Sequence, residues 1–187
     1  MRSSKKENPI SQSSQNSPSR NHAMRRAVSF IFILTLLAAT THAQLMNASK
    51  SDTYAFRLKP NEDLKSGILS FAKTHHIKAG AIVTCVGSLR QFHLRFANQE
   101  KGSVQNGHFE IVSMTGTFSD STSHLHLSIS DSTGRTVGGH LLEDNLIYTT
   151  AELVIIDLKD LEFGREVDPT FGYQELLIKP KKKSGKK

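Results

Sequence analysis

SHLHLSISDSTGRTVGGHLL, residues 123–142, is the stretch that decides the fold. Polar and apolar residues alternate over its first eight positions, which predicts a β-strand with one buried face. DSTG, residues 131–134, then suits a type I turn that ends in a left-handed glycine, a common three-residue hairpin loop. If residues 132–134 form this loop, Asp131 lies opposite Arg135. The stretch therefore predicts a β-hairpin with a defined register.

Counting back from this loop puts His126 opposite His140 and His124 opposite Leu142, on one face of the hairpin. The other face then carries a set of apolar side chains: Leu125, Leu127, Ile129, Val137 and Leu141. Opposed side chains have Cβ atoms about 4.5–5.5 Å apart, so the imidazoles can converge. Three histidines with one open coordination position are typical of a catalytic or ligand-binding zinc site, and imidazole also suits copper, iron and nickel. We predict a metal site, for zinc or another transition metal, at His124, His126 and His140.

A second interpretation of the same residues stays open. Histidines on the solvent face of a hairpin can be ordinary polar residues, and a loop one residue longer would turn His140 to the apolar side. The hairpin also does not say what a bound metal would do.

Residues 1–43 carry the features of a leader. Residues 1–23 are polar, with almost nothing to bury, and are predicted to be disordered. Residues 24–43 begin with Met24, two arginines and an apolar run, and end in Thr-His-Ala, which predicts a secretory signal peptide. The run is shorter than the ~20 residues that span a bilayer, so we expect no lasting anchor, with an uncleaved signal anchor as the alternative. Translation then starts at Met1 or at Met24.

The signal peptide implies a secreted or periplasmic protein. Its only cysteine, Cys85, lies in an apolar run and is predicted to be a core residue rather than a reactive thiol. Asn47 begins a glycosylation sequon, which matters only in a eukaryotic host.

Charge argues against a nucleic-acid partner. The whole chain has a net charge of +7, but residues 44–178 hold 12 basic and 16 acidic residues, a net of −4. The excess positive charge lies in the leader and in residues 179–187, which hold six lysines and are predicted to be a basic disordered tail. We therefore expect no binding of nucleic acid by the folded part.

The rest of the chain alternates strand patterns with one helix. Residues 61–75 have an N-cap, first-turn acids and helical spacing of Leu64, Ile68 and Phe71. Strands are predicted before and after this helix, with a break at Gly87-Ser88, a turn at 98–102 and a loop at 163–172; their ranges are 53–58, 81–86, 91–96, 107–117, 148–157 and 175–178. The long run 148–157 is expected to cross the middle of a sheet.

Glu152 interrupts that long apolar run. A carboxylate in a central strand is costly unless it is paired or binds a metal, so Glu152 is a second-tier site candidate. A hydrogen bond at an edge or an interface would explain it equally well.

The order of these motifs resembles the plant and prokaryote conserved (PPC) domain, in a stand-alone form. The resemblance covers residues 53–178 and rests on Gly87-Ser88-Leu89, the hexapeptide Gly107-His108-Phe109-Glu110-Ile111-Val112, His124-Leu125-His126, Gly134-Arg135, Gly138-Gly139-His140 and Glu152. It implies an α+β fold, a mostly antiparallel sheet flanked by one helix, assembled as a homotrimer. It also implies a metal at His124, His126 and His140, and partner contacts at residues 107–112.

Two features depart from the plant members of that family. The chain contains no Arg-Gly-Arg-Pro core of an AT-hook, and His108 stands where those members typically have arginine. A secretion signal is also foreign to a nuclear regulator, so DNA binding is not carried over.

These observations predict a secreted or periplasmic, trimeric, metal-binding protein whose small ligand is unknown. A metal-dependent enzyme acting on a small carbonyl or hydroxy-acid substrate is the alternative, by fold analogy with acetolactate decarboxylase and with Glu152 as acid or base. A DNA-associated regulator, as in plant PPC proteins, is a third hypothesis.

Overall fold

The computed structural model describes residues 47–182. These residues form eight strands and one helix: β1 (Ser51–Leu58), α2 (Leu64–Thr74), β2 (Gly80–Arg95), β3 (Ser103–Phe118), β4 (Ser123–Ser130), β5 (Thr136–Leu141), β6 (Leu146–Leu158), β7 (Leu161–Val167) and β8 (Gln174–Pro180). The predicted disordered segment and signal peptide lie outside the described residues.

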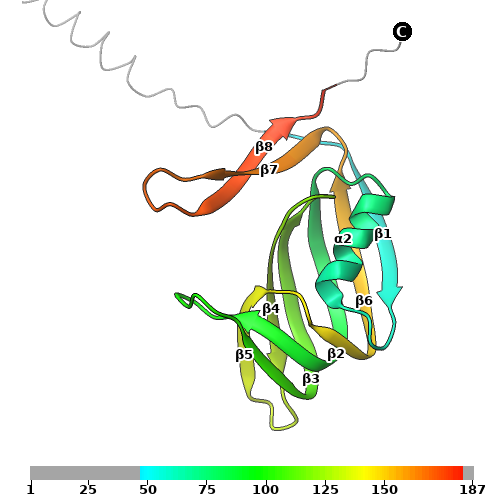
Figure 1. Cartoon of the computed structure of the whole chain (residues 1–187). Helices are drawn as coiled ribbons and strands as arrows, with labels where there is room; N and C mark the ends of the chain where they lie inside the picture. Colours follow the sequence, from blue (N-terminus) through cyan, green and yellow to red (C-terminus); the bar gives the residue numbers. More distant parts are fainter. Residues whose placement is uncertain (1–46, 183–187) are drawn as a thin grey trace, which may run out of the picture. The chain divides into compact units, whose positions relative to one another are not determined.

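Six strands make one sheet in the order β1-β6-β2-β3-β4-β5, in which every neighbouring pair is antiparallel (Figure 1). The end of β2 also pairs with β5, through Leu94 with Leu141 and Arg95 with His140. Strand β2 pairs with β3, β3 with β4, β4 with β5, and β5 again with β2, so these four strands form a closed cycle. The predicted α+β class with a mostly antiparallel sheet and one helix is confirmed, and β6 crosses the interior of the sheet as expected.

Helix α2 covers one face of the sheet (Figure 1). Its N-cap is Asp63, whose carboxylate accepts a hydrogen bond from the Ser66 amide at 2.7 Å. Leu64 and Ile68 are fully buried, as the helical spacing predicts, and so is Ala72, whereas Phe71 is partly buried. Burying one such leucine or isoleucine side chain contributes about 1.5–3 kcal/mol. The core therefore lies between α2 and the inner face of the sheet.

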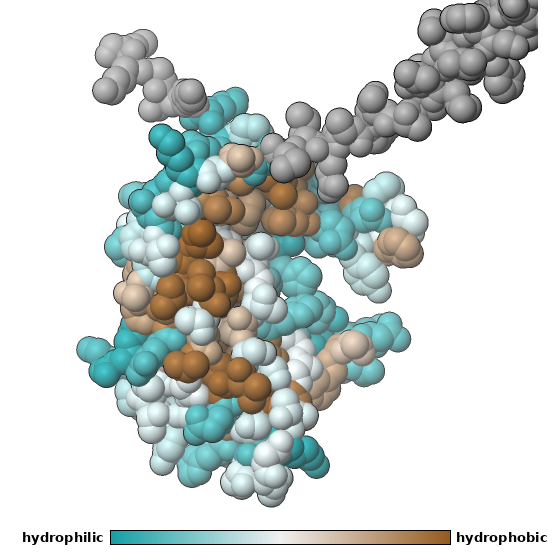
Figure 2. All heavy atoms as spheres, turned by 180° about the vertical axis from the view of Figure 1, so that it is seen from behind, coloured by the Kyte–Doolittle hydropathy of each residue, from teal (hydrophilic) through white to brown (hydrophobic). Residues whose placement is uncertain are grey.

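No helix of residues 47–182 covers the opposite face. Viewed from that side, apolar side chains gather in a broad patch (Figure 2). Large apolar side chains that stay exposed on β2, β3 and β6 are Val83, Val86, Val104, Val112 and Tyr148. The sheet thus has one buried face and one that is open to a partner.

Three details of the predicted secondary structure are wrong. Strand β2 does not break at Gly87-Ser88, because Gly87 adopts a φ of 145° and the ladder to β6 shifts register there. Residues 163–167 of the predicted loop belong to strand β7, which pairs with β8. Pairing across the hairpin also extends β8 to Pro180, so Lys179, opposite Glu162, does not belong to a disordered tail. Long-range pairing decides each case.

Candidate metal centre

The β4–β5 hairpin is held in register by its turn. Asp131 Oδ1 accepts hydrogen bonds from the Thr133 amide (2.9 Å), the Thr133 hydroxyl (2.6 Å) and the Arg135 amide (3.1 Å). These bonds hold the pKa of Asp131 below its ordinary value. Gly134 has a φ of 81°, which suits glycine, and the Asp131 amide donates to the Arg135 carbonyl at 3.0 Å. The loop predicted from the sequence is therefore confirmed.

This register places three histidines together. His126 lies directly opposite His140 in the ladder, and His124 lies two residues earlier on the same face of β4. His124 Nε2 is 3.1 Å from His126 Nε2, which is 3.2 Å from His140 Nδ1. One ring nitrogen from each residue lies within 4.8 Å of the others. The predicted convergence of the three imidazoles is thus observed.

Strand β3 supports His124 from the other side. Gly116 has a φ of 135° and pairs with Leu125, and a Cβ at this position would collide with the backbone carbonyl of His124. Only glycine lets the two backbones approach this closely.

The two short nitrogen–nitrogen distances, from His126 to His124 and to His140, fit a shared cation. At a Zn–N bond length of about 2.0–2.1 Å, tetrahedral geometry puts two ligand nitrogens roughly 3.3 Å apart. Hydrogen bonding alone fits less well, because His126 Nε2 takes part in both short contacts. A ring nitrogen has either one N–H or one lone pair, so it satisfies one neighbour and not two. A cation between three lone pairs would satisfy all three imidazoles.

The electrostatics favour the neutral imidazole, the form that binds metals, at His124 and His140. Burial lowers the pKa of His124, and His126 and Arg165 lower it further, while Glu175 acts in the opposite direction. Burial also lowers the pKa of His140, with the charge of Arg95 as the next cause.

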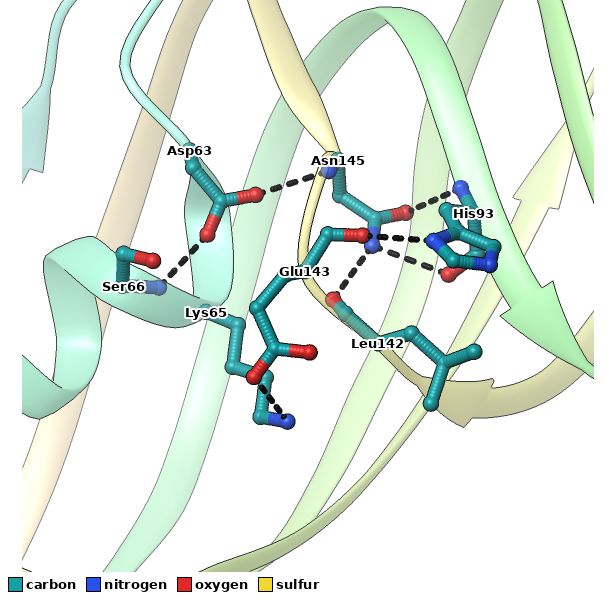
Figure 3. A network of polar contacts seen from close by, with 7 residues as sticks. All are labelled: Asp63, Lys65, Ser66, His93, Leu142, Glu143 and Asn145. Carbon is teal, nitrogen blue, oxygen red and sulfur yellow. Dashed lines mark hydrogen bonds and ion pairs between the residues drawn. The ribbon is translucent and has the colours of Figure 1, made fainter. Parts of the chain in front are cut away.

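A polar network fixes the end of β5 to β2 (Figure 3). Asn145 is fully buried; its Nδ2 donates to the carbonyls of Leu142 (2.7 Å) and His93 (3.0 Å), and its Oδ1 accepts from the His93 amide (3.0 Å). The second carboxylate oxygen of Asp63 accepts from the Asn145 amide at 2.7 Å. The N-cap of α2 is therefore connected to the strand that carries His140.

The role of Asn145 is not predicted by the sequence. Asn145 follows Glu143-Asp144 between two strands, where a polar residue is typical of a turn, and no local pattern marks it as buried. The one feature that could have indicated its burial is its place in the chain, between β5 and β6, which both pair with β2.

A cavity of about 330 Å³ lies beside two of the histidines. Its lining consists of His126, His140, three hydroxyl side chains and neighbouring residues: Ser113, Thr115, Ser128, Ala97, Leu127, Gly138 and Gly139. Three protein ligands with a space next to them leave room for a further ligand on a bound metal.

The other candidate residues are not part of this cluster. Glu152 is exposed on β6, opposite Val86, and is not among the groups of ligand side chains found in residues 47–182. The segment Gly107–Val112 lies in β3, where Phe109 and Ile111 are buried and His108 stacks on Tyr148 with ring centroids 4.4 Å apart. Its role in partner contacts stays a prediction. Asn47 is exposed.

Known proteins match the part of this chain that holds the sheet and the histidine hairpin. The family model of the Plants and Prokaryotes Conserved (PCC) domain matches residues 46–159. A bifunctional protein GlmU of Synechococcus sp. strain JA-3-3Ab is 40% identical over 141 residues, which are 75% of this chain and 23% of that protein. The chain thus spans less than a quarter of the length of the curated relatives it matches.

Solved structures show the same fold. A hypothetical protein from Salmonella enterica is 39% identical, with a TM-score of 0.70, and the match covers 72% of this chain and 97% of that one. A metal-containing protein from Archaeoglobus fulgidus is 23% identical, with a TM-score of 0.58 over 71% of this chain and 99% of that one. A protein from Bacteroides thetaiotaomicron described as a putative DNA-binding protein has the same TM-score at 22% identity, over 70% of this chain and 97% of that one.

In residues 47–182, no helix combines the length and apolar character needed to cross a membrane.

Proposed function

This chain belongs to the Plants and Prokaryotes Conserved domain family, and from that premise we propose that it is a homotrimeric protein that binds a transition metal, zinc first, through His124, His126 and His140. The observation that carries the proposal is the double contact of His126 Nε2 with a nitrogen of each other histidine, at 3.1 and 3.2 Å. Imidazole nitrogens at these distances form a ready-made set of metal ligands.

The neighbours add support for a metal. The Archaeoglobus fulgidus structure is called metal-containing, and it shares the fold of this chain. Three histidines with an open position are typical of metals that exchange a ligand, rather than of closed structural sites with four protein ligands.

The homotrimer rests on the family resemblance and on the sheet face that lacks a helix. Val83 and Val86 on β2 and Val112 on β3 are each more than half exposed, and exposed apolar patches mark protein interfaces. In the proposed assembly, copies of this chain cover that face.

The protein is proposed to be secreted or periplasmic, on the strength of residues 24–43. N-terminal sequencing of the protein recovered from the expressing cells tests this proposal. A mature N-terminus at Gln44 supports cleavage, whereas retention of residues 24–43 indicates a signal anchor.

Metal content per chain is the decisive measurement. Protein expressed from Gln44 is analysed by elemental mass spectrometry and sized by light scattering, with His126→Ala and the matched control His76→Asn. His76 is exposed and has a φ of 53°, which asparagine tolerates. We expect close to one metal ion per chain, lost in His126→Ala and kept in His76→Asn, with the same trimer in all three proteins. Metal-free protein in every case would refute the metal site, and a monomer would refute the assembly.

A metal-dependent enzyme is the second candidate, favoured by the cavity beside His126 and His140. A bound metal there would polarise a carbonyl oxygen as a Lewis acid. Turnover of small carbonyl or hydroxy-acid compounds that is lost on chelation and restored by metal supports the enzyme; turnover that persists in His126→Ala argues against it.

DNA association has the least support. Two neighbours carry the description putative DNA-binding protein, but the acidic excess in residues 44–178 opposes contact with phosphates. If DNA binding occurs, removal of residues 180–187 should abolish it.

A further inference from the structure

Two glycines of β5, Gly138 and Gly139, line the cavity beside the histidines. Gly138 lies opposite Ser128, and His140 lies opposite His126, all on the same face. On β3, Ser113 and Thr115 lie opposite Ser128 and His126. A hollow therefore forms over Gly138, with two imidazoles at one end and hydroxyl groups along the side.

The hydroxyl groups of this hollow are unused by the protein. Ser113, Thr115 and Ser128 line the cavity, and among residues 47–182 their side chains have no hydrogen-bond partner. A hydroxyl both donates and accepts, so three of them together suit a ligand that carries hydroxyl or carbonyl groups.

The charge of the site calls for an anion. None of the nine residues that line the cavity is acidic. Imidazole ligands bring no negative charge, so they leave the full charge of a bound metal uncompensated. Arg95 lies directly opposite His140 on β2; it does not line the cavity, and its Nη1 donates to the Gln99 carbonyl at 3.2 Å, but its positive charge lowers the pKa of His140. One acidic group, Glu175 on β8, raises the pKa of His124, but it does not line the cavity. Carboxylate oxygens are good ligands of zinc and form charge-assisted bonds with arginine.

The volume is large enough for a small organic ligand. At about 30 Å³ per water molecule, 330 Å³ holds roughly eleven waters. A compound of three to six carbons fits this space.

We infer that this cavity binds a small hydroxycarboxylate, whose carboxylate completes the coordination of the metal near Arg95 and whose hydroxyl groups bond to Ser113, Thr115 and Ser128. The inference rests on the proposed metal site and names the ligand class of that site.

The test uses the protein from Gln44 loaded with Co²⁺, whose visible absorption reports both metal binding and a change of ligand. Four probes are titrated: glycerate, propionate, glycerol and inorganic phosphate. We expect glycerate to change the spectrum at concentrations about thirtyfold lower than propionate, since each of its two hydroxyls adds a hydrogen bond of about 1 kcal/mol. Glycerol, which lacks the carboxylate, and phosphate should bind more weakly still.

Variants separate the roles of the side chains. Thr115→Val and Ser128→Ala should each raise the Kd of glycerate about fivefold and leave that of propionate unchanged. Arg95→Gln should raise the Kd of both acids. Thr117→Val, which lies one pleat away on the same strand and outside the cavity lining, is the matched control and should change neither.

The outcomes distinguish the two proposals. If Co²⁺ does not bind, the metal site fails and the ligand inference fails with it. If Co²⁺ binds but glycerate is no better than propionate, or Thr115→Val and Ser128→Ala bind glycerate like the parent, only the ligand inference is overturned. Tighter binding of phosphate than of glycerate would also overturn it.

Discussion

Replacing Asn145, a fully buried polar residue between β5 and β6, should strongly destabilise the protein. Its side chain is fully buried and makes three hydrogen bonds, to the Leu142 carbonyl and to both backbone groups of His93. Asn145→Leu removes all three bonds. The His93 carbonyl keeps a bond from the Leu142 amide at 3.2 Å, so the His93 amide and the Leu142 carbonyl are the groups left without the partner that Asn145 provides.

The expected loss follows from these two groups. Each orphaned buried group costs about 1–3 kcal/mol, so the free energy of unfolding should fall by about 2–6 kcal/mol. A domain of this size has about 5–15 kcal/mol in total, so the loss is large.

Asn145→Asp tests the direction of these bonds. Aspartate still accepts from the His93 amide, but its second oxygen would face two carbonyls that need a donor, and its charge would be buried. We therefore expect Asn145→Asp to be at least as destabilising as Asn145→Leu, although it is nearly isosteric with asparagine. Asn106→Asp, at an exposed position of β3, is the matched control and should change the free energy of unfolding by less than about 0.5 kcal/mol.

The assay is equilibrium unfolding in urea, followed by circular dichroism. All proteins are compared at one protomer concentration and without metal, because an oligomer and a bound ion both shift apparent stability. A loss below about 1 kcal/mol for both Asn145 variants, at an unchanged dependence on urea, would refute the reasoning.

Three further predictions follow from single positions. Gly116→Ala would put a Cβ at a φ of 135° and against the His124 carbonyl. We expect the free energy of unfolding in urea to fall by several kcal/mol and metal binding to be lost. Unchanged stability and unchanged metal binding would contradict the close approach of the two backbones. Burial raises the pKa of the Cys85 thiol to about 12, so the thiol should stay protonated from pH 7 to pH 9. A thiol reagent should therefore label it only as fast as the protein unfolds. Rapid labelling of the native protein would show that the thiol is not buried. Asp131→Ala removes three hydrogen bonds of the hairpin turn and should lower the free energy of unfolding by about 1–2 kcal/mol. Thr133→Ala removes only the hydroxyl donor and should lower it by less. Equal effects of the two variants would refute the role of Asp131 in holding the turn.

Local patterns determine much of the site. The loop at residues 132–134 sets the register by its own turn chemistry, and alternation then decides which residues share a face. For this reason the sequence alone predicts His126 opposite His140, and the ladder has that pairing. Every contact that this prediction needs lies within one hairpin.

Local patterns fail where a distant strand decides the outcome. Residues 161–167 alternate weakly, and the predicted loop covers most of them, but their partner at 174–180 makes them strand β7. Gly87-Ser88 has the composition of a break, yet pairing with both β3 and β6 carries β2 through it. Glu152, a candidate on chemical grounds, lies exposed and outside the histidine cluster.

The sequence by itself determined the helix with its cap, the hairpin and the convergence of its three histidines, because each depends on residues close together in the chain, and the class of fold followed from the resemblance to the PPC domain. Only the tertiary structure decided the order of the strands, the burial of Asn145, the approach of Arg95 to His140 and the cavity over Gly138. Each of these results from residues that lie far apart in the sequence and become neighbours only when β2 pairs with β5 and β3 with β4. Such long-range pairing is selected by the packing of the whole sheet and leaves no local pattern in the sequence.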